Sequence, residues 1–286
     1  MSGRFTSTRR KITNAVMLSL TGLCALFTVG VLFFILGYLF WNGGRSLNIS
    51  FFTQLPKPVG ETGGGMANAI VGSFKVLALA MALGFPLGFL AGVYLSEYSR
   101  GFLPGFLRYM TDLLNGVPSI VMGVLVYTLI VLPTRHFSAY AGGVALGIIM
   151  VPIAVRSTEE FLRGVPNNLR EGAMALGASK WWSIVSVVIP AAASGIITAV
   201  MLGLARVAGE TAPLLFTAFG NRFWAHGWNE PTSTLPVMIY TYAISPYEDW
   251  HRQAWAAGFV LLVSIFVINI VARFVVSAGF VRTPRR

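Results

Sequence analysis

Two charged residues of opposite sign, Arg206 and Glu210, stand four positions apart at the end of a long apolar segment. On a helix this spacing puts both side chains on one face, where they could pair. Ionisable groups at membrane depth are costly and usually face a cavity or a partner. Two interpretations follow: an ion pair that fixes helix packing, or a pathway in which Arg206 helps an anion across while Glu210 limits how tightly it is held.

Lys75 is a further candidate for contact with an anion, although its place near the outer end of an apolar segment also fits a side chain that reaches the interface. The one cysteine, Cys24, lies in an apolar segment. The histidines fall in short connecting segments: His136, His226 and His251. These spacings predict no metal site and no cofactor. No nucleophile, base and orienting group occur together, so we expect a protein that is not an enzyme.

A short helix is predicted at 169–176, inside the long polar stretch 156–182. The preceding Pro166-Asn167-Asn168 offers a start, because asparagine can cap free amide groups. Gly177 supplies a stop.

The predicted helix has one apolar face and is slim. Leu169, Ala173 and Leu176 fall on that face at spacings of four and three, while Arg170 and Glu171 point elsewhere. Gly172 and Ala173 keep the helix narrow enough to enter a groove. It is either a helix lying on the membrane or an element that docks into a separate soluble partner.

Gly172 and Gly177 are five positions apart, as in a phosphate-binding loop. That loop requires Gly-Lys-Ser/Thr after its second glycine, whereas Ala178-Ser179-Lys180 follows here and no apolar strand precedes. We predict no ATP site, so an ATP-driven process would need another polypeptide.

The composition places these residues in a membrane protein. Of the 286 residues, 55% are hydrophobic and 11% are charged, against roughly 25% charged in a soluble domain. The net charge of +11 forms no basic stripe of the kind that binds nucleic acid. A helix needs about 20 apolar residues to cross a bilayer. Six segments qualify, which predicts an all-α protein with six transmembrane helices: Ala15–Trp41, Met66–Leu95, Leu113–Pro133, Ala139–Val155, Ser183–Arg206 and Ala254–Ala278.

Basic residues set the orientation through their excess on the cytoplasmic side. With both termini in the cytoplasm, five basic residues lie outside, at Arg45, Lys57, Arg135, Arg222 and Arg252. Fourteen then lie inside: Arg4, Arg9, Arg10, Lys11, Arg100, Arg108, Arg156, Arg163, Arg170, Lys180, Arg273, Arg282, Arg285 and Arg286.

This orientation divides the chain into regions. We expect a cytoplasmic tail at 1–14, the first helix at 15–41, an outer loop at 42–65, a core at 66–278 that contains the cytoplasmic loop 156–182, and a basic tail at 279–286. In the second span, Gly84, Gly88 and Gly92 lie on one helical face and predict close packing against another helix.

The cytoplasmic loop resembles a known motif. Glu171-Gly172-Ala173, Gly177 and Val187-Val188-Ile189-Pro190 resemble the EAA motif of bacterial ABC importer permeases, with small or apolar replacements at Gly172, Val187 and Ile189. The resemblance implies the type I importer fold, also called MetI-like. It also implies a bacterial inner-membrane location and a coupling helix that docks into an ATPase subunit.

A more specific resemblance is to the PstA family of phosphate importer permeases. It rests on Arg206, on Gly209-Glu210-Thr211-Ala212-Pro213, on Gly116-Val117-Pro118-Ser119 and on Arg156-Ser157-Thr158-Glu159-Glu160, and it extends from about Asn68 onward. It implies transport of inorganic phosphate. The implied partners are a PstC-like permease, two PstB-like ATPase subunits and a PstS-like periplasmic binding protein.

Three alternatives remain. The chain could be a permease for sulfate or molybdate, or the sister phosphate permease of the PstC type, although Ala212-Pro213 favours the PstA type. A self-contained secondary transporter or channel is disfavoured, because the first half contains no second copy of the Gly-Glu-Thr-Ala-Pro element.

Overall fold

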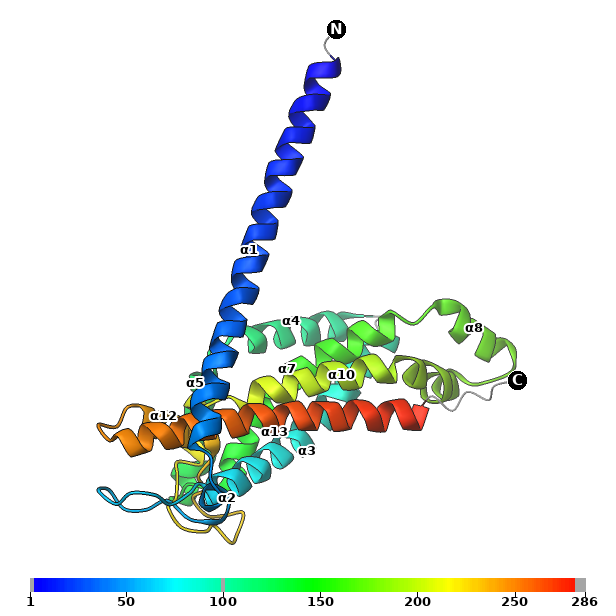
Figure 1. The fold of residues 1–286 in the computed structure, drawn as a ribbon. Helices are drawn as coiled ribbons and strands as arrows, with labels where there is room; N and C mark the ends of the chain where they lie inside the picture. Colours follow the sequence, from blue (N-terminus) through cyan, green and yellow to red (C-terminus); the bar gives the residue numbers. More distant parts are fainter. Residues whose placement is uncertain (1–2, 99–100, 281–286) are drawn as a thin grey trace.

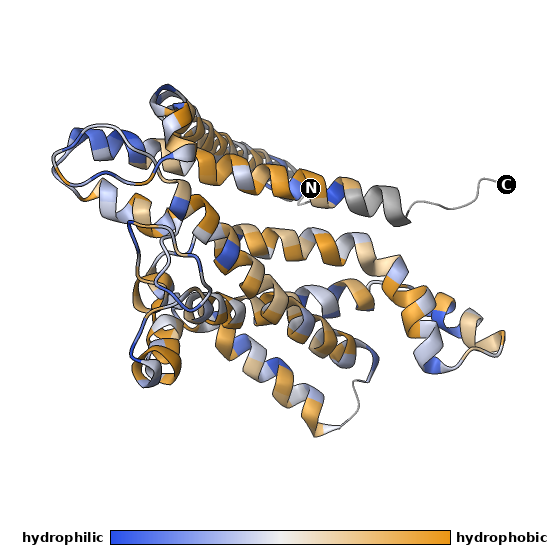
Figure 2. Cartoon of the chain, turned by 90° about the horizontal axis from the view of Figure 1, so that it is seen from below, coloured by the Kyte–Doolittle hydropathy of each residue, from blue (hydrophilic) through white to orange (hydrophobic). Residues whose placement is uncertain are grey.

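The computed structural model describes residues 3–98 and 101–280, and its regular structure is helical. Five of its helices are long and apolar enough to cross a membrane, or up to six if one bent pair forms a single span. The five spans run along α1 (Gly3–Ser46), α3 (Ala67–Glu97), α7 (Ala139–Arg163), the helical segment from Lys180 that ends with α10 (Ile189–Ala208), and α13 (Glu248–Phe280). Hydrophobic residues follow the long helices, and hydrophilic ones gather toward helix ends and loops (Figure 2). The predicted all-α membrane fold is confirmed.

The third predicted span is the main correction to the predicted elements. In place of one helix at 113–133, α4 (Phe102–Gly116) and the segment Ser119–Thr134 meet at a bend of 100°. Val117 is extended, with φ −74° and ψ 130°, because a proline disfavours helical backbone at the residue before it. Ser119–Thr134 is itself built from α5 (Ser119–Val126), the π-helical η1 (Tyr127–Val131) and α6 (Leu132–Thr134).

Helices α3 and α7 pack face to face through the three glycines. A Cβ atom at Gly84 would lie 2.7 Å from the Gly147 carbonyl oxygen, and one at Gly92 would lie 2.6 Å from the Thr158 Cβ atom. Only glycine admits this approach, so the predicted close packing is confirmed.

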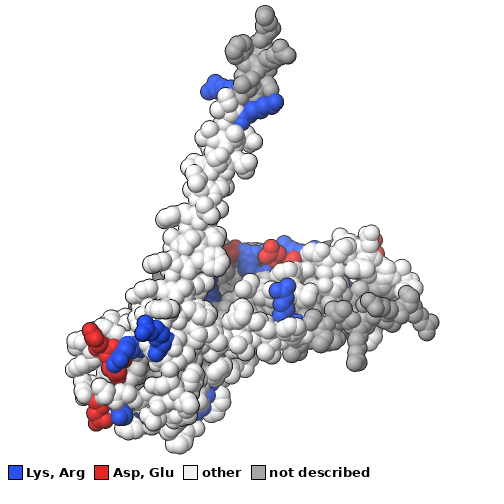
Figure 3. All heavy atoms as spheres, in the orientation of Figure 1, with Lys and Arg blue, Asp and Glu red and all other residues white. Residues whose placement is uncertain are grey.

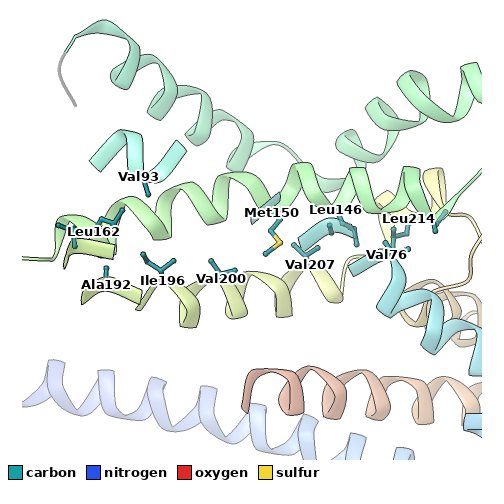
Figure 4. Packing of buried hydrophobic residues seen from close by; sticks show 14 of the residues in the cluster. Val76, Val93, Leu146, Met150, Leu162, Ala192, Ile196, Val200, Val207 and Leu214 are labelled. Atoms are coloured by element: carbon teal, nitrogen blue, oxygen red, sulfur yellow. The ribbon is translucent and has the colours of Figure 1, made fainter. Parts of the chain in front are cut away.

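Helix α7 lies at the centre of the bundle. Of its apolar stretch, 61% is buried inside the protein, compared with none of α1. It contacts α3 and α10 along its length and α4, α5 and α11 (Ala212–Thr217) elsewhere. Figure 4 shows the core between these helices, which includes Val76, Val93, Leu146, Met150, Leu162, Ile196, Val200, Val207 and Leu214.

Helix α1 leaves the bundle at a steep angle (Figure 1). It is one continuous helix, so described residues predicted as a tail before position 15 are helical. Its last turns touch α13, where the Tyr38 ring meets Trp255 at 5.2 Å and Phe40 meets Phe259 at 4.9 Å. The apolar side chains before this contact, such as Phe27, are exposed.

The end of the bundle that carries the predicted outer loop is closed by loops and two short helices. The predicted loop 42–65 contains α2 (Ile49–Thr53), and the aromatic segment before α13 contains α12 (Leu235–Ala243). The backbone amide of Leu235 donates to the buried Ser73 hydroxyl at 2.7 Å, which ties α12 to α3. Burial raises the pKa of the Tyr242 hydroxyl, so the ring stays neutral in its stack on Trp250.

The opposite end carries the long polar connection. Helix α7 continues to Arg163, beyond the expected boundary near Val155. It is followed by α8 (Asn167–Ala175), α9 (Lys180–Ser183) and the π-helical η2 (Ile184–Val188), which leads into α10. The predicted basic tail 279–286 lies outside the described residues except for its first two positions.

Replacing Gly88 by alanine should destabilise the α3–α7 contact. The added Cβ atom would overlap the Ala154 Cβ atom and lie 2.8 Å from the Val151 carbonyl oxygen, and overpacking of this kind costs about 1–3 kcal/mol. The thermal midpoint of the purified protein in detergent, followed by tryptophan fluorescence, should fall. Gly30→Ala on α1 is the matched control, because no atom lies within 4 Å of its added Cβ. Equal midpoints for the two variants would contradict the packing described.

Candidate functional site

The first candidate site is an open apolar groove along α8. It has a volume of about 870 Å³ and its lining includes Leu169, Gly172, Ala173, Leu176 and Gly177. The Leu176 side chain is 91% exposed, and no atom lies within 4 Å of a Cβ built on Gly172. The predicted common face is confirmed, because Leu169, Ala173 and Leu176 all line this groove. Trp182 and Val187, from the segment that leads into α10, line it as well.

The two ends of α8 differ in how well the sequence predicted them. The helix begins after Pro166, which makes no side-chain cap, so the predicted asparagine cap is wrong. The C-terminal stop is confirmed: Gly177 has φ +88°, a conformation that favours glycine. Its amide donates to the Met174 carbonyl at 2.9 Å, and the Ala178 amide donates to the Ala173 carbonyl at 3.2 Å.

The opposite face of α8 is fastened to the end of α3. Arg170 Nη2 lies 2.8 Å from Glu97 Oε1 in an ion pair whose side chains are 16% and 6% exposed. Arg170 also donates to the carbonyls of Leu162 and Val165. Lys180 Nζ donates to the Glu97 carbonyl at 2.6 Å. Arg170 therefore positions α8, whereas Glu171 is exposed to solvent.

The second candidate site is a polar cavity of about 150 Å³ that contains Arg206 and Glu210. The α4–α5 bend contributes Asn115 and Ser119, and α7 contributes apolar side chains such as Ile153. Arg206 is in the last turn of α10, and Glu210 follows the helix end. The cavity is therefore assembled from three parts of the chain that are distant in sequence.

Arg206 and Glu210 share the cavity without bonding to each other. Helix α10 ends at Ala208 with Gly209 as its cap, so the two residues are not on one helical face. Across the described residues, neither side chain forms an ion pair within 4.0 Å. The expectation of a pair at helical spacing is wrong within this chain, because Gly209 ends the helix between them.

Lys75 lies apart from this cavity, in the half of α3 that begins at Ala67. Its Nζ atom donates to the Ala225 carbonyl at 2.7 Å, and it lines a space of only about 10 Å³ between α3 and the segment 223–233. The structure thus brings Arg206 and Glu210 together and places Lys75 elsewhere, against the loop.

A charged cluster at the other end of α7 did not emerge from the sequence. Buried Glu159 lies 2.6 Å from Arg108 Nε and 3.0 Å from Arg163 Nη2. Arg156 pairs with Asp112 of α4. Figure 3 shows that charged atoms gather in a few places on an otherwise uncharged surface. The i to i+4 spacing of Glu159 and Arg163 could have indicated part of the cluster from the sequence. Its partners on α4 can be identified only from the fold.

Metal chemistry receives no support from the part of the chain that is described, where no group of three or more His, Cys, Asp or Glu side chains is placed to hold an ion. Cys24 is exposed on α1.

The fold and both sites can be compared with known proteins. A model of the family described as "Binding-protein-dependent transport system inner membrane component" matches residues 84–278. The phosphate transport system permease protein PstA of Haemophilus influenzae is 43% identical over 265 residues, which cover 92% of this chain and 94% of that protein. PstA of Yersinia pestis is 41% identical over 267 residues, covering 93% and 90%.

Solved structures with a similar fold come from ABC transporters. A chain of the MetNI methionine ABC transporter in an inward-facing conformation has a TM-score of 0.60 and 21% identity, covering 74% of this chain and 96% of that one. A chain of a bacterial alginate ABC transporter, in complex with its alginate pentasaccharide-bound periplasmic protein, has a TM-score of 0.64 and 14% identity and covers 98% of each chain. The fold is therefore similar to that of MetI-type importer permeases.

Replacing Arg170 by glutamine should loosen α8 from α3. The change leaves the Glu97 carboxylate buried without its cation, and breaking such a pair costs up to about 3–5 kcal/mol when burial is complete. We expect faster chymotrypsin cleavage at the neighbouring Trp181 and Trp182, which are exposed, and a lower thermal midpoint.

Arg252→Gln is the control for this variant. Its ion pair with Asp249 has a side chain that is 67% exposed, and exposed pairs contribute about 0–1 kcal/mol. Equal cleavage rates for the two variants would show that the Arg170 pair does not hold α8.

Proposed function

We propose that this chain, which belongs to the family of inner membrane components of binding-protein-dependent transport systems, is the permease subunit of an ATP-driven importer of inorganic phosphate. The observation that carries the substrate is the similarity to PstA permeases over more than 90% of the chain. It extends beyond the 84–278 region shared by the wider family.

The family defines the kind of partner. A permease of a binding-protein-dependent ABC transporter works with an ATPase and with a binding protein that supplies its substrate. We propose more specifically a PstC-like permease as the second half of the pathway, two PstB-like ATPases, and a PstS-like protein that delivers phosphate at the outer face. The chain itself makes and breaks no covalent bond.

We propose that α8 is the element that docks into the ATPase. Its apolar side chains include the exposed Leu176, and Gly172 keeps the helix narrow, which suits insertion into a cleft of another protein. Arg170, on the opposite face, fixes α8 to the bundle through Glu97. Movement of a docked ATPase would then be transmitted through α8 to the bundle. The two permeases would alternate between outward and inward openings.

The proposed orientation places both termini in the cytoplasm. The excess of basic residues on that side supports it. For the C-terminal helix the fold agrees with it, since α8 and the last turns of α13 lie at one end of the bundle, and α2 and α12 lie at the other, whereas α1 leaves the bundle at a steep angle (Figure 1). The ammonium of Lys75 then binds the outer loop, at the periplasmic side.

We assign the pathway to the cavity that contains Arg206 and Glu210. A cation without an ion-pair partner in the described residues is available to an anion, and charge-assisted hydrogen bonds to tetrahedral oxyanions are strong. We propose that Lys75 supports the entrance of this pathway, where its hydrogen bond to the Ala225 carbonyl holds the loop in place.

Arg206→Gln should reduce phosphate uptake by at least about tenfold, because a hydrogen bond to a charged group contributes about 1.5–3 kcal/mol. Uptake of radiolabelled phosphate is measured in a strain that lacks its own permease, with sulfate and molybdate as competitors. Arg222→Gln, in the exposed outer loop, makes the same change of charge and should retain uptake. Normal uptake by Arg206→Gln, or competition by sulfate as effective as by phosphate, would contradict the assignment.

Leu176→Asp should abolish co-purification of the ATPase with the permease, because a charge replaces the most exposed apolar side chain of the groove. Loss of a central apolar contact at an interface costs at least about 2 kcal/mol. Ile49→Asp is the control: this side chain is 83% exposed and lies at the other end of the bundle. Wild-type recovery of ATPase with Leu176→Asp would place the docking surface elsewhere.

A further inference from the structure

The cavity of Arg206 contains a carboxylate that an anion site does not need. Glu210 lines the same space of about 150 Å³, and among the described residues no cation neutralises it within 4.0 Å. A negative charge beside a path for anions repels every anion electrostatically. The Glu210 carboxylate therefore needs a function that offsets this repulsion.

The backbone fixes where the two charges stand. The Gly209 amide donates to the Arg206 carbonyl at 3.2 Å, and the Glu210 amide donates to the Val207 carbonyl at 3.1 Å. These bonds close the last turn of α10 and hold Glu210 immediately beyond it. Arg206 and Glu210 are therefore presented to the cavity from a capped helix end and not from a free loop.

The remaining polar side chains of the lining are neutral. Asn115 and the Ser119 hydroxyl can each donate or accept a hydrogen bond, whereas an ionised carboxylate only accepts. Glu210 is thus the one lining side chain described whose charge favours a ligand that brings its own proton.

Tetrahedral oxyanions differ in that property. Phosphate and sulfate have nearly the same size and shape, so a cavity of this volume does not separate them by fit. Phosphate at neutral pH retains at least one O–H group, which can donate to a carboxylate, whereas sulfate is fully deprotonated and meets the same carboxylate as a like charge. Discrimination of this kind works by penalising the wrong ligand.

We infer that Glu210 selects protonated oxyanions: its carboxylate accepts the hydrogen bond of a phosphate O–H group while Arg206 binds the ionised oxygens. The inference rests on the proposed function, because it assigns a role within the same pathway. It makes the permease a second point of selection, after any choice made by the protein that delivers the substrate.

The test measures binding in the cavity without the binding protein. In the assembled permease–ATPase complex, Ser119→Cys introduces a thiol into the lining, and Cys24→Ser removes the native cysteine of this chain. Alkylation of this chain by N-ethylmaleimide is followed with increasing inorganic phosphate or sulfate. Leu114→Cys, which also lines the cavity, is a second reporter if the first complex does not assemble.

With Glu210 intact, we expect half-protection to require about tenfold more sulfate than phosphate or a larger excess, the factor for one unfavourable polar contact of about 1.4 kcal/mol. Glu210→Gln supplies an amide that donates to sulfate, so the two anions should then protect at concentrations within about twofold. Glu160→Gln, an exposed glutamate on α7, is the matched control and should keep the preference.

The outcomes distinguish failure of the role of Glu210 from failure of the proposed function. Equal protection by both anions with Glu210 intact, or an unchanged preference in Glu210→Gln, overturns the selection role. Absence of protection by either anion in a complex that imports phosphate also overturns it and leaves the proposed function standing. If the complex with the native chain imports no phosphate when the binding protein is added, the proposed function itself fails.

Discussion

The close contact between α3 and α7 is the interaction on which the rest of the structure depends. Lipid offers helices no hydrophobic reason to associate, so they associate through van der Waals packing that small residues permit. Gly84, Gly88 and Gly92 let α3 approach the backbone of α7. This contact places α7 at the centre of the bundle, where it supplies one wall of the cavity and the buried Glu159 of the charged cluster.

The polar side chains that line the cavity stand where helices end or break. Arg206 and Glu210 stand at the capped end of α10, and Asn115 and Ser119 flank the bend between α4 and α5. Irregular backbone at membrane depth is tolerated where it is buried in protein or lines a cavity. The interruptions of regular helix thus coincide with the one cavity to which we assign an anion.

The sequence was sufficient for features that depend on local pattern. Apolar length predicted the long helices, a spacing of four predicted the glycine face, and Gly177 predicted the end of α8. It was insufficient where a local break competes with an apolar run. The predicted span Leu113–Pro133 rested on its apolar content and took no account of the helix break at Val117-Pro118. The spacing of four between Arg206 and Glu210 likewise took no account of Gly209, which ends the helix between them. Contacts such as Arg170 to Glu97, separated by 73 positions, depend on the assembled bundle.

The attachment of α8 has a mechanical consequence. Along the chain, α8 follows α7 through a short connection. The Arg170 guanidinium of α8 and the nearby Lys180 ammonium nevertheless both bind Glu97, the last residue of α3. A force applied at α8 is thereby shared between two neighbouring helices at once. In the proposed coupling role, α3 and α7 therefore move together when the partner moves α8.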